Sequence, residues 1–265
     1  MGSCLSMFKG HAADLGEDLL WTFFQIIFLQ TLLELSLLTM FNWSYRVTFG
    51  AVEARLPEVL TLEAPPWLEA GLAMLVTMLA IDCAAYCLHR AMHAVPALWR
   101  LHKVHHSAAF LTPFSAFRQH PLEPLLLKGV RGLAAGIALG LLHAFFPQCT
   151  PVWAFSGMGF GFFLYMFTVN LHHAPIPVCY PRILRSWLIS PHIHHLHHSQ
   201  AQRHHDKNFG VVFSLWDQMF SSYLDEEVQL GELVFGLAAV KADHALHVRT
   251  DRQSQTELKI YRQPD

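Results

Sequence analysis

Charged side chains are scarce in this sequence. Asp, Glu, Lys and Arg make up 14% of its 265 residues, whereas a typical soluble domain has roughly 25%. Hydrophobic residues make up 53%. So little charge and so much apolar surface argue against an ordinary soluble domain, and we expect an integral membrane protein.

The sequence also lacks an excess of basic residues. Its 18 Lys and Arg residues stand against 20 Asp and Glu residues, which gives a formal net charge of -2. Nucleic-acid binding depends on a basic surface that neutralises phosphates. We therefore expect no nucleic-acid partner.

Cysteine motifs are absent. The five cysteines include no Cys-x-x-Cys pair, which argues against a disulfide framework and a cysteine zinc site. The chain also has no Gly-x-Gly-x-x-Gly motif for a dinucleotide, no cysteine cluster for an iron-sulfur centre and no cytochrome b5 signature. Electrons for a redox reaction would have to come from a separate protein.

Long apolar segments are present instead. A membrane-spanning helix needs about 20 mostly apolar residues, and four segments meet or approach this length: 19–41, 67–88, 132–146 and 152–170. We expect four transmembrane helices in two hairpins, which places both termini on one side of the membrane.

Lysine and arginine predict the orientation, because these residues resist translocation. The connection between the second and third segments contains Arg90, Arg100, Lys103, Arg118 and Lys128. The loop between the first and second segments has only Arg46 and Arg55. We therefore expect the central connection and the C-terminal region on the cytoplasmic face of a bacterial inner membrane or of the endoplasmic reticulum.

Histidine is abundant, with 19 residues, and three motifs concentrate it on the expected cytoplasmic side. HRAMH (89–93) places two histidines four residues apart, on one face of a helix. HKVHH (102–106) and HHLHH (194–198) each contain histidines at i, i+3 and i+4. The motifs supply eight candidate metal ligands: His89, His93, His102, His105, His106, His194, His197 and His198.

Eight imidazoles exceed the four ligands of one zinc ion, so we expect two metal ions. Imidazole binds iron, zinc, copper and nickel, so the ligands alone do not identify the metal. The location of the site in the protein has to indicate which one it is. A site beside apolar membrane segments indicates a lipid substrate with an unactivated C–H bond, whose oxidation calls for iron and dioxygen. We expect two iron ions, which zinc can replace in purified samples.

Carboxylates behind the ligands would offset the charge of two cations and would orient the imidazoles by accepting from their distal N–H groups. Asp82 lies seven residues before His89 and therefore on the same helical face. Glu123 and Asp206 are further candidates, and Asn208 joins them as a candidate site residue.

Four stretches carry a resemblance to a known family: DCAAYCLHRAMH, LHKVHHS, FRQHPLE and SPHIHHLHHSQAQRHHDKNFGVVFSLWDQMFSSY. They are similar to the fatty acid hydroxylase superfamily, whose members include sterol desaturases, C-4 methyl sterol oxidases and alkylglycerol monooxygenase. The resemblance runs from about residue 67 to residue 224, and it implies that the eight motif histidines are metal ligands.

The resemblance also implies a further ligand between the second and third motifs, for which NLHHAP offers His173 first and His172 second. His120 matches a histidine of the sterol desaturases, either as a ligand or as a residue behind a ligand. The chain departs from the family at Pro175 and Pro177, where the pattern around that further ligand is usually fuller. The usual ending WDRLFGTY is here WDQMFSSY.

Four more histidines lie outside the motifs, and we expect them to be solvated or hydrogen-bonded: His192, His195, His204 and His205. The expected fold is an all-α integral membrane protein, with four transmembrane helices in two hairpins and a cytoplasmic, helical, histidine-rich cap that holds two metal ions. Residues 1–18 form an N-terminal segment, 19–224 the membrane domain with its catalytic cap, and 225–265 a polar tail.

The expected function is that of a di-iron oxygenase that hydroxylates or desaturates a lipid. It would use dioxygen and electrons from a separate donor, such as a cytochrome b5, a ferredoxin or a reductase. The alternative is a histidine-rich membrane metal transporter or metal-binding protein without oxygenase activity. A transporter would place ionisable residues along the spans as an ion path.

Overall fold

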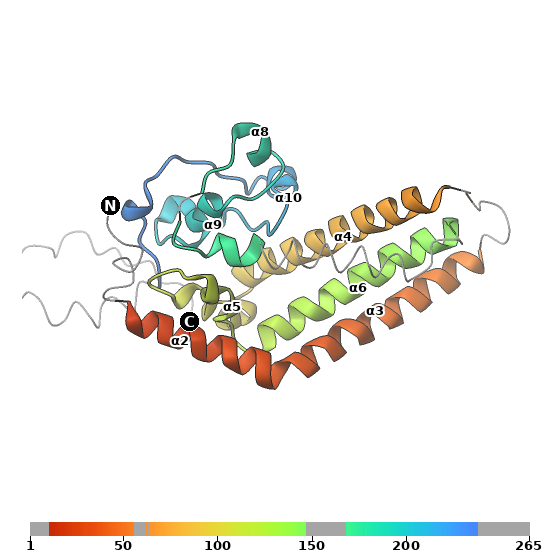
Figure 1. The fold of residues 1–265 in the computed structure, drawn as a ribbon, viewed down its shortest axis with the longest axis horizontal. Helices are drawn as coiled ribbons and strands as arrows, with labels where there is room; N and C mark the ends of the chain where they lie inside the picture. The colour runs from red at the N-terminus through yellow and green to blue at the C-terminus, as the bar shows by residue number, and fades with distance from the viewer. Residues whose placement is uncertain (1–10, 56–61, 63, 147–167, 177, 238–265) are drawn as a thin grey trace, which may run out of the picture.

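Three long helices form one end of the molecule, and short helices and loops form the other (Figure 1). The computed structural model describes residues 11–55, 62, 64–146, 168–176 and 178–237. Over these residues the secondary structure is helical, apart from an isolated β-bridge between Leu188 and Phe213. The expected all-α class is confirmed for this part of the chain.

The N-terminal apolar segment forms a bent helical run instead of one straight helix. α2 (Ala12–Phe24) continues through a π-helical turn, η1 (Gln25–Leu29), into α3 (Gln30–Glu53). A π-helical turn interrupts the regular hydrogen-bond ladder and is a common cause of bends. Figure 1 shows the bend at this point, where α2 turns toward the short helices. The expected span 19–41 is therefore divided between two helices.

Prolines set the ends of the next helices. α4 (Pro66–Ala94) has Pro66 in its first turn and ends just before Pro96, which begins α5 (Pro96–His102). Proline fits a first turn because it has no N–H to satisfy there, and it disfavours helix at the residue before it. α6 (Leu122–Phe145) packs against both α3 and α4.

Glycines allow α6 to lie directly against α3. Gly132, Gly136 and Gly140 recur every fourth residue and face the backbone of α3. A Cβ atom at Gly136 would overlap the carbonyl oxygen of Phe41 and the hydroxyl of Ser44. Small residues at this spacing bring membrane helices into close contact.

Within the part of the chain that the structure describes, three helical segments are long and apolar enough to cross a membrane: Ala12–Glu53, Pro66–Ala94 and Leu122–Phe145. Large apolar side chains such as Leu35 and Trp43 are exposed on them, as expected for helices surrounded by lipid. The expected fourth span, 152–170, falls mostly outside the described residues. The arrangement in two hairpins and its orientation stay predictions.

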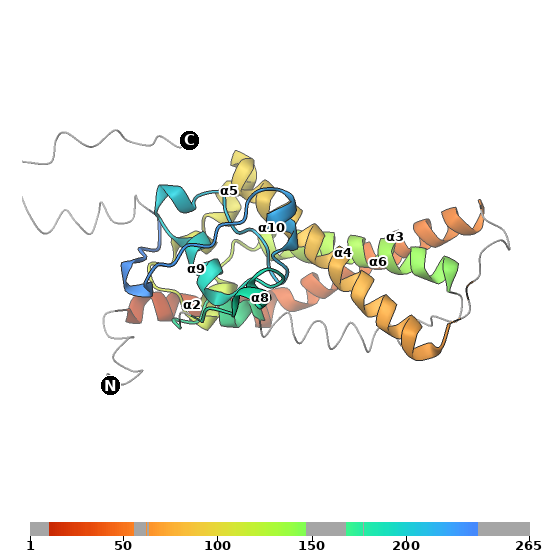
Figure 2. The ribbon, with the colours of Figure 1, turned by 90° about the horizontal axis from the view of Figure 1, so that it is seen from above.

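The short elements form a cap, which Figures 1 and 2 both place at one end of the long helices. The cap contains α5, η2 (His105–Ser107), η3 (Pro113–Phe117), α8 (Arg182–Arg185), α9 (Pro191–His198), η4 (Gln202–His204), α10 (Leu215–Met219) and η5 (Leu230–Glu232).

Part of the expected polar tail belongs to the cap. Leu233 and Phe235 are buried in an apolar cluster with Leu196 of α9. The boundary expected at residue 225 therefore falls inside a packed region, which extends to these residues. Residues 238–265 lie outside the described part of the chain.

Candidate metal centre

Four elements bring the motif histidines together: α4 ends with HRAMH, α5 and η2 carry HKVHH, and α9 carries HHLHH. The start of α9 is well defined. The Ser190 hydroxyl accepts a hydrogen bond from Ile193 N at 3.3 Å, and Pro191 occupies the first turn. Both are common features of helix starts, and they fix the direction of the histidines that follow.

Among the described residues, nine histidines form two groups, in each of which one ring nitrogen from every member lies within 4.8 Å of those of the others. The first histidine group consists of His89, His93, His102, His106 and His197. The second histidine group consists of His105, His173, His194 and His198. Both groups draw on the eight motif histidines, and His173, the preferred one of the two alternatives in NLHHAP, completes the second.

Each triplet motif contributes to both groups. In HKVHH, His102 of α5 and His106 of η2 lie in the first group, whereas His105, the neighbour of His106 in η2, lies in the second. In α9, His194 and His198 are four residues apart and share the second group, whereas His197 belongs to the first. The triplets therefore do not act as separate metal-binding units.

In the second histidine group the Nε2 atoms lie close together. His173 Nε2 is 3.2 Å from His105 Nε2 and 3.2 Å from His194 Nε2. His194 Nε2 is in turn 3.0 Å from His198 Nε2. Four imidazoles thus direct the same ring atom into one small space.

In the first histidine group the Nε2 atoms are likewise buried and available for a ligand. His102 Nε2 lies 3.2 Å from His106 Nε2. The Nε2 atoms of His89, His93 and His197 are buried and have no hydrogen-bond partner among the described residues. An unsatisfied buried polar atom costs about 1–3 kcal/mol, and a bound cation would remove that cost for all of them.

Four rings have an oxygen acceptor at Nδ1. The pairs are His89 with Phe209 O (2.8 Å), His102 with Glu123 Oε1 (2.8 Å), His173 with Val169 O (2.9 Å) and His197 with Lys207 O (2.8 Å). An oxygen acceptor requires the proton on Nδ1, which leaves a lone pair on Nε2. The surroundings therefore favour the tautomer that can bind a metal through Nε2.

Burial also keeps the histidines of the cap neutral. It lowers the pKa of His173 to about 4. Burial, together with the neighbouring imidazoles, lowers the pKa values of six others well below their ordinary value: His102, His105, His106, His194, His197 and His198. Neutral rings keep the lone pair that a metal needs.

These donor sets fit metal ions. Four or five converging imidazole nitrogens satisfy the coordination needs of a transition metal, and iron, zinc and copper all accept them. Each group could hold one ion, which agrees with the expected count of two.

Glu123 meets the expectation of a carboxylate behind a candidate ligand. It is buried at the start of α6, and its Oε1 accepts from His102. Asp82 has different partners from those expected. Its carboxylate accepts from the backbone N–H groups of Val212 and Phe213 at 3.0 and 3.1 Å and from the Trp216 indole at 2.9 Å.

Two other candidates lie away from both groups. Asp206 is exposed, with a φ of 56°. Asn208 is fully buried with a φ of 58°, and its side-chain amide pairs with the backbone N–H and C=O of Leu224, each at 2.8 Å. Asn208 therefore shapes the loop after α9 and does not face a histidine group.

Asp217 is a site residue that the sequence did not reveal. It is fully buried in α10, and its carboxylate accepts from Phe209 N at 2.9 Å, Gly210 N at 2.7 Å and the Ser222 hydroxyl at 2.7 Å. Burial raises the pKa of this carboxyl, and these hydrogen bonds oppose the rise. The sequence signal is a single charged residue in the otherwise uncharged stretch SLWDQMF.

The remaining histidines are outside both groups. His120 Nδ1 accepts from Leu122 N at 3.3 Å, at the start of α6. His172 Nε2 donates to Ile189 O at 2.9 Å. Of the four surplus histidines, His205 is exposed, whereas three are buried in the cap: His192, His195 and His204.

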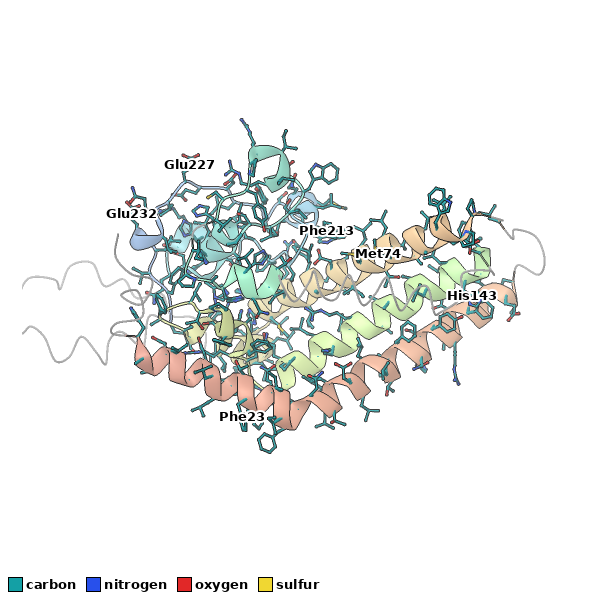
Figure 3. All side chains as sticks on the ribbon, in the orientation of Figure 1. Phe23, Met74, His143, Phe213, Glu227 and Glu232 are labelled. Atoms are coloured by element: carbon teal, nitrogen blue, oxygen red, sulfur yellow. The ribbon has the colours of Figure 1, made fainter. Side chains whose placement is uncertain are left out.

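A largely apolar cavity of about 490 Å³ lies among α3, α4 and α6 and reaches the cap. Met74 of α4 and Phe213 of the cap, both labelled in Figure 3, line it. Val169 also lines it, and the carbonyl of the same residue accepts from His173. The cavity therefore adjoins the second histidine group, and its volume is within the range of about 300–1,000 Å³ that small-molecule pockets have.

Comparisons with known proteins identify relatives of the chain. The model of the family described as fatty acid hydroxylase matches residues 74–222. The chain is 26% identical to lathosterol oxidase of Mus musculus over 157 residues. This alignment covers 59% of this chain and 46% of that protein. It is 28% identical over 145 residues to alkylglycerol monooxygenase of Caenorhabditis elegans, covering 54% of this chain and 25% of that protein.

A third relative is the Delta(7)-sterol 5(6)-desaturase of Leptosphaeria maculans, which is 27% identical over 142 residues, covering 54% of this chain and 34% of that protein. The aligned part spans about half the length of lathosterol oxidase and less of the other two. No solved structure matches the chain. The resemblance noted in the sequence is confirmed.

Proposed function

We propose, from the fact that the chain belongs to the fatty acid hydroxylase family, that it is a membrane-bound oxygenase of lipids. It would use dioxygen and external electrons to hydroxylate or desaturate an unactivated C–H bond of a fatty acyl, sterol or related lipid. The observation that carries the proposal is the position of two buried histidine groups, the second of which adjoins an apolar cavity through Val169.

The first and second histidine groups would each hold one iron ion, through five and four candidate ligands respectively. Iron supplies the activation of dioxygen that an unactivated C–H bond requires. Zinc in a purified sample would not contradict this assignment, because imidazole sites accept zinc readily. His120 and His172 are not in the proposed ligand set, since neither is part of a group.

The residues of the chain have distinct tasks in this proposal. The cavity binds the apolar body of the lipid and excludes water from the reacting carbon. Glu123 and the carbonyl oxygens of Phe209, Lys207 and Val169 hold protons at Nδ1 and keep Nε2 of the ligands available. Asp82 and Asp217 hold the loop that presents two of these carbonyl groups.

Electrons would come from a separate donor, such as a cytochrome b5, a ferredoxin or a reductase. The excess of lysine and arginine in the connection between α4 and α6 favours a cytoplasmic position for the cap. A cytoplasmic donor would then reach the histidine groups from the side opposite to the long helices.

Lipid analysis under isotopically labelled dioxygen tests the proposal. Cells that express the chain are compared with cells that express His197→Ala, which removes a candidate ligand, and with cells that express His205→Ala, which changes an exposed histidine. Hydroxylation should yield a lipid with one labelled oxygen, and desaturation a lipid that lacks two hydrogens and carries no label. The product should appear with wild type and His205→Ala and be absent with His197→Ala.

Two outcomes would contradict this function. One is an unchanged lipid extract from cells in which the wild-type protein is metal-loaded and a suitable reductase is present. The other is metal uptake that depends on the histidine groups without any change in lipids, which would favour the metal transporter.

A further inference from the structure

A buried ion pair joins α2 to the cap. Asp18 of α2 is 0% exposed and Arg118 is 2% exposed, and Arg118 Nε donates to Asp18 Oδ1 at 2.6 Å. The other carboxylate oxygen of Asp18 accepts from the hydroxyl groups of Thr112 and Ser115, each at 2.6 Å. Thr112 and Arg118 flank η3, so a single carboxylate holds both ends of this element.

Further contacts strengthen the same connection. Arg118 Nη2 lies 3.3 Å from Asp14 Oδ1, and Arg118 Nη1 lies 3.2 Å from Glu17 Oε2. α2 thus presents three carboxylates to one guanidinium, and the cluster carries negative charge in excess. The Gln25 side chain, about two turns of helix after Asp18, donates to Phe117 O. Figures 1 and 2 both place α2 alongside the cap, in agreement with its contacts to η3.

This cluster lies behind the second histidine group. η3 packs against η2, which contains His105. The Thr112 and Ser115 hydroxyls and the Arg118 guanidinium all bond to the Asp18 carboxylate. Asp18 therefore fixes the element that packs against the turn of His105.

We propose that Asp18 is a positioning residue for the second histidine group: it fixes the loop behind His105. This inference rests on the proposed function, because it takes the group to be a metal site. Glu123 bonds directly to His102 of the first group, whereas Asp18 acts on the second group through η3 and η2. Each group would then have a buried carboxylate behind it, supplied by a different helix, and α2 would be part of the active centre.

Metal titration of Asp18→Asn tests the inference. The full-length protein in detergent is stripped of metal and titrated with cobalt(II), and bound metal is measured by elemental analysis and by the cobalt absorption spectrum. Wild type should bind two ions per chain. In Asp18→Asn one ion should bind about 10 to 100-fold more weakly, as when a partner behind a ligand is lost.

Two ligand variants identify the ion that is weakened. His194→Ala removes a member of the second group, and His89→Ala removes a member of the first. Asp18→Asn should lose the absorption bands that His194→Ala loses and keep those that His89→Ala loses. Glu17→Gln is the matched control, because it changes a carboxylate of the same cluster that is 53% exposed, and it should bind both ions as wild type does.

A double variant separates positioning from simple destabilisation. Asp18→Asn leaves the Arg118 charge without its closest partner, and Asp18→Asn with Arg118→Gln removes both charges. If the double variant regains the affinity of wild type for both ions, the loss came from the unpaired arginine and the inference is overturned. Wild-type affinity in Asp18→Asn itself would overturn it as well. A wild-type protein that binds two ions but changes no lipid would refute the proposed function and leave this inference intact.

Discussion

At the scale of single residues, two buried aspartates hold the loop that serves the first histidine group. Asp217 binds the backbone N–H groups of Phe209 and Gly210, and Phe209 offers its carbonyl oxygen to His89. Asp82 binds the same loop a few residues later, through Val212 and Phe213. Neither carboxylate contacts a candidate ligand, yet both determine where the acceptor for His89 lies.

Replacement of Asp217 by asparagine should destabilise the cap. The carboxylate serves three donors, and an amide offers one oxygen, so at least one buried N–H or O–H group loses its acceptor. The expected loss in the free energy of unfolding is about 1–3 kcal/mol, measured by denaturation of the protein in detergent. Asp206→Asn is the control, because that residue is exposed at a φ of 56°, which asparagine tolerates. Equal stability of both variants would refute the anchoring role of Asp217.

Replacement of Glu123 by glutamine should weaken metal binding at the first histidine group. The amide oxygen can still accept from His102 Nδ1 but carries no negative charge, so the Nε2 lone pair becomes a poorer donor. We expect a loss in affinity of about 10 to 100-fold, measured by metal titration. Glu232→Gln should leave the affinity unchanged, because Glu232, labelled in Figure 3, is an exposed residue of η5. A similar affinity for Glu123→Gln and wild type would contradict the role of this carboxylate.

The motif histidines could be predicted from the sequence because their spacing is a local property of the chain. The division of HKVHH between the two groups could not, because it depends on the different directions in which the neighbouring side chains of His105 and His106 point in η2. The role of Asp217 could not be predicted either. Two of its three partners are backbone N–H groups of a loop, and backbone groups leave no pattern in a sequence.

At the scale of secondary-structure elements, α6 packs closely against α3 because glycines of α6 lie at the contact. Gly132, Gly136 and Gly140 form the contact surface, whereas hydropathy alone indicates only that 132–146 is apolar. The π-helical turn η1 could not be predicted from hydropathy either, because an apolar sequence that continues from α2 into α3 is compatible with a straight or a bent helix. By contrast, the starts of α4 and α5 coincide with Pro66 and Pro96, which are local features of the sequence.

Replacement of Gly136 by alanine should separate α6 from α3. The new Cβ atom would overlap backbone and side-chain atoms of α3, and overpacking of this kind costs about 1–3 kcal/mol. Gly71→Ala is the control on α4, because a Cβ atom there meets nothing within 4 Å and alanine favours helix by about 1 kcal/mol. Thermal unfolding in detergent should show a lower melting temperature for Gly136→Ala alone. An unchanged melting temperature would mean that the two helices are not in close contact.

At the scale of the whole molecule, the orientation in the membrane decides which electron donors can reach the cap. A reporter inserted after residue 110, or fused to the C-terminus, should be cytoplasmic, and one inserted near residue 55 should be on the opposite side. The reason is the excess of lysine and arginine around the cap. Protease or thiol-labelling accessibility on intact vesicles measures both positions. An external signal from residue 110 would reverse the orientation and exclude a cytoplasmic donor.

The pH dependence of stability is also a property of the whole molecule, because many imidazoles are buried together. Burial lowers the pKa of His172 to about 3 and the pKa values of His173 and His195 to about 4, from an ordinary value of about 6.5. Above pH 6.5 these rings are neutral in the folded and the unfolded chain, so their titration does not affect stability. As the pH falls below 6.5, the unfolded chain takes up protons that the folded chain cannot, and stability is lost until the folded pKa values are reached.

The metal-free protein should therefore unfold at progressively lower temperature from pH 7 to pH 5, with each such ring contributing up to about 1.4 kcal/mol per pH unit. His195 lies outside both groups, so His195→Gln should reduce this dependence without removing a candidate ligand. His205→Ala, which changes an exposed histidine, should retain the full dependence. A melting temperature that stays constant from pH 7 to pH 5 would contradict the burial of neutral rings. The melting temperature of the metal-loaded protein should fall more steeply between pH 7 and pH 5, because protons then also compete with the metal for the lone pairs of the imidazoles.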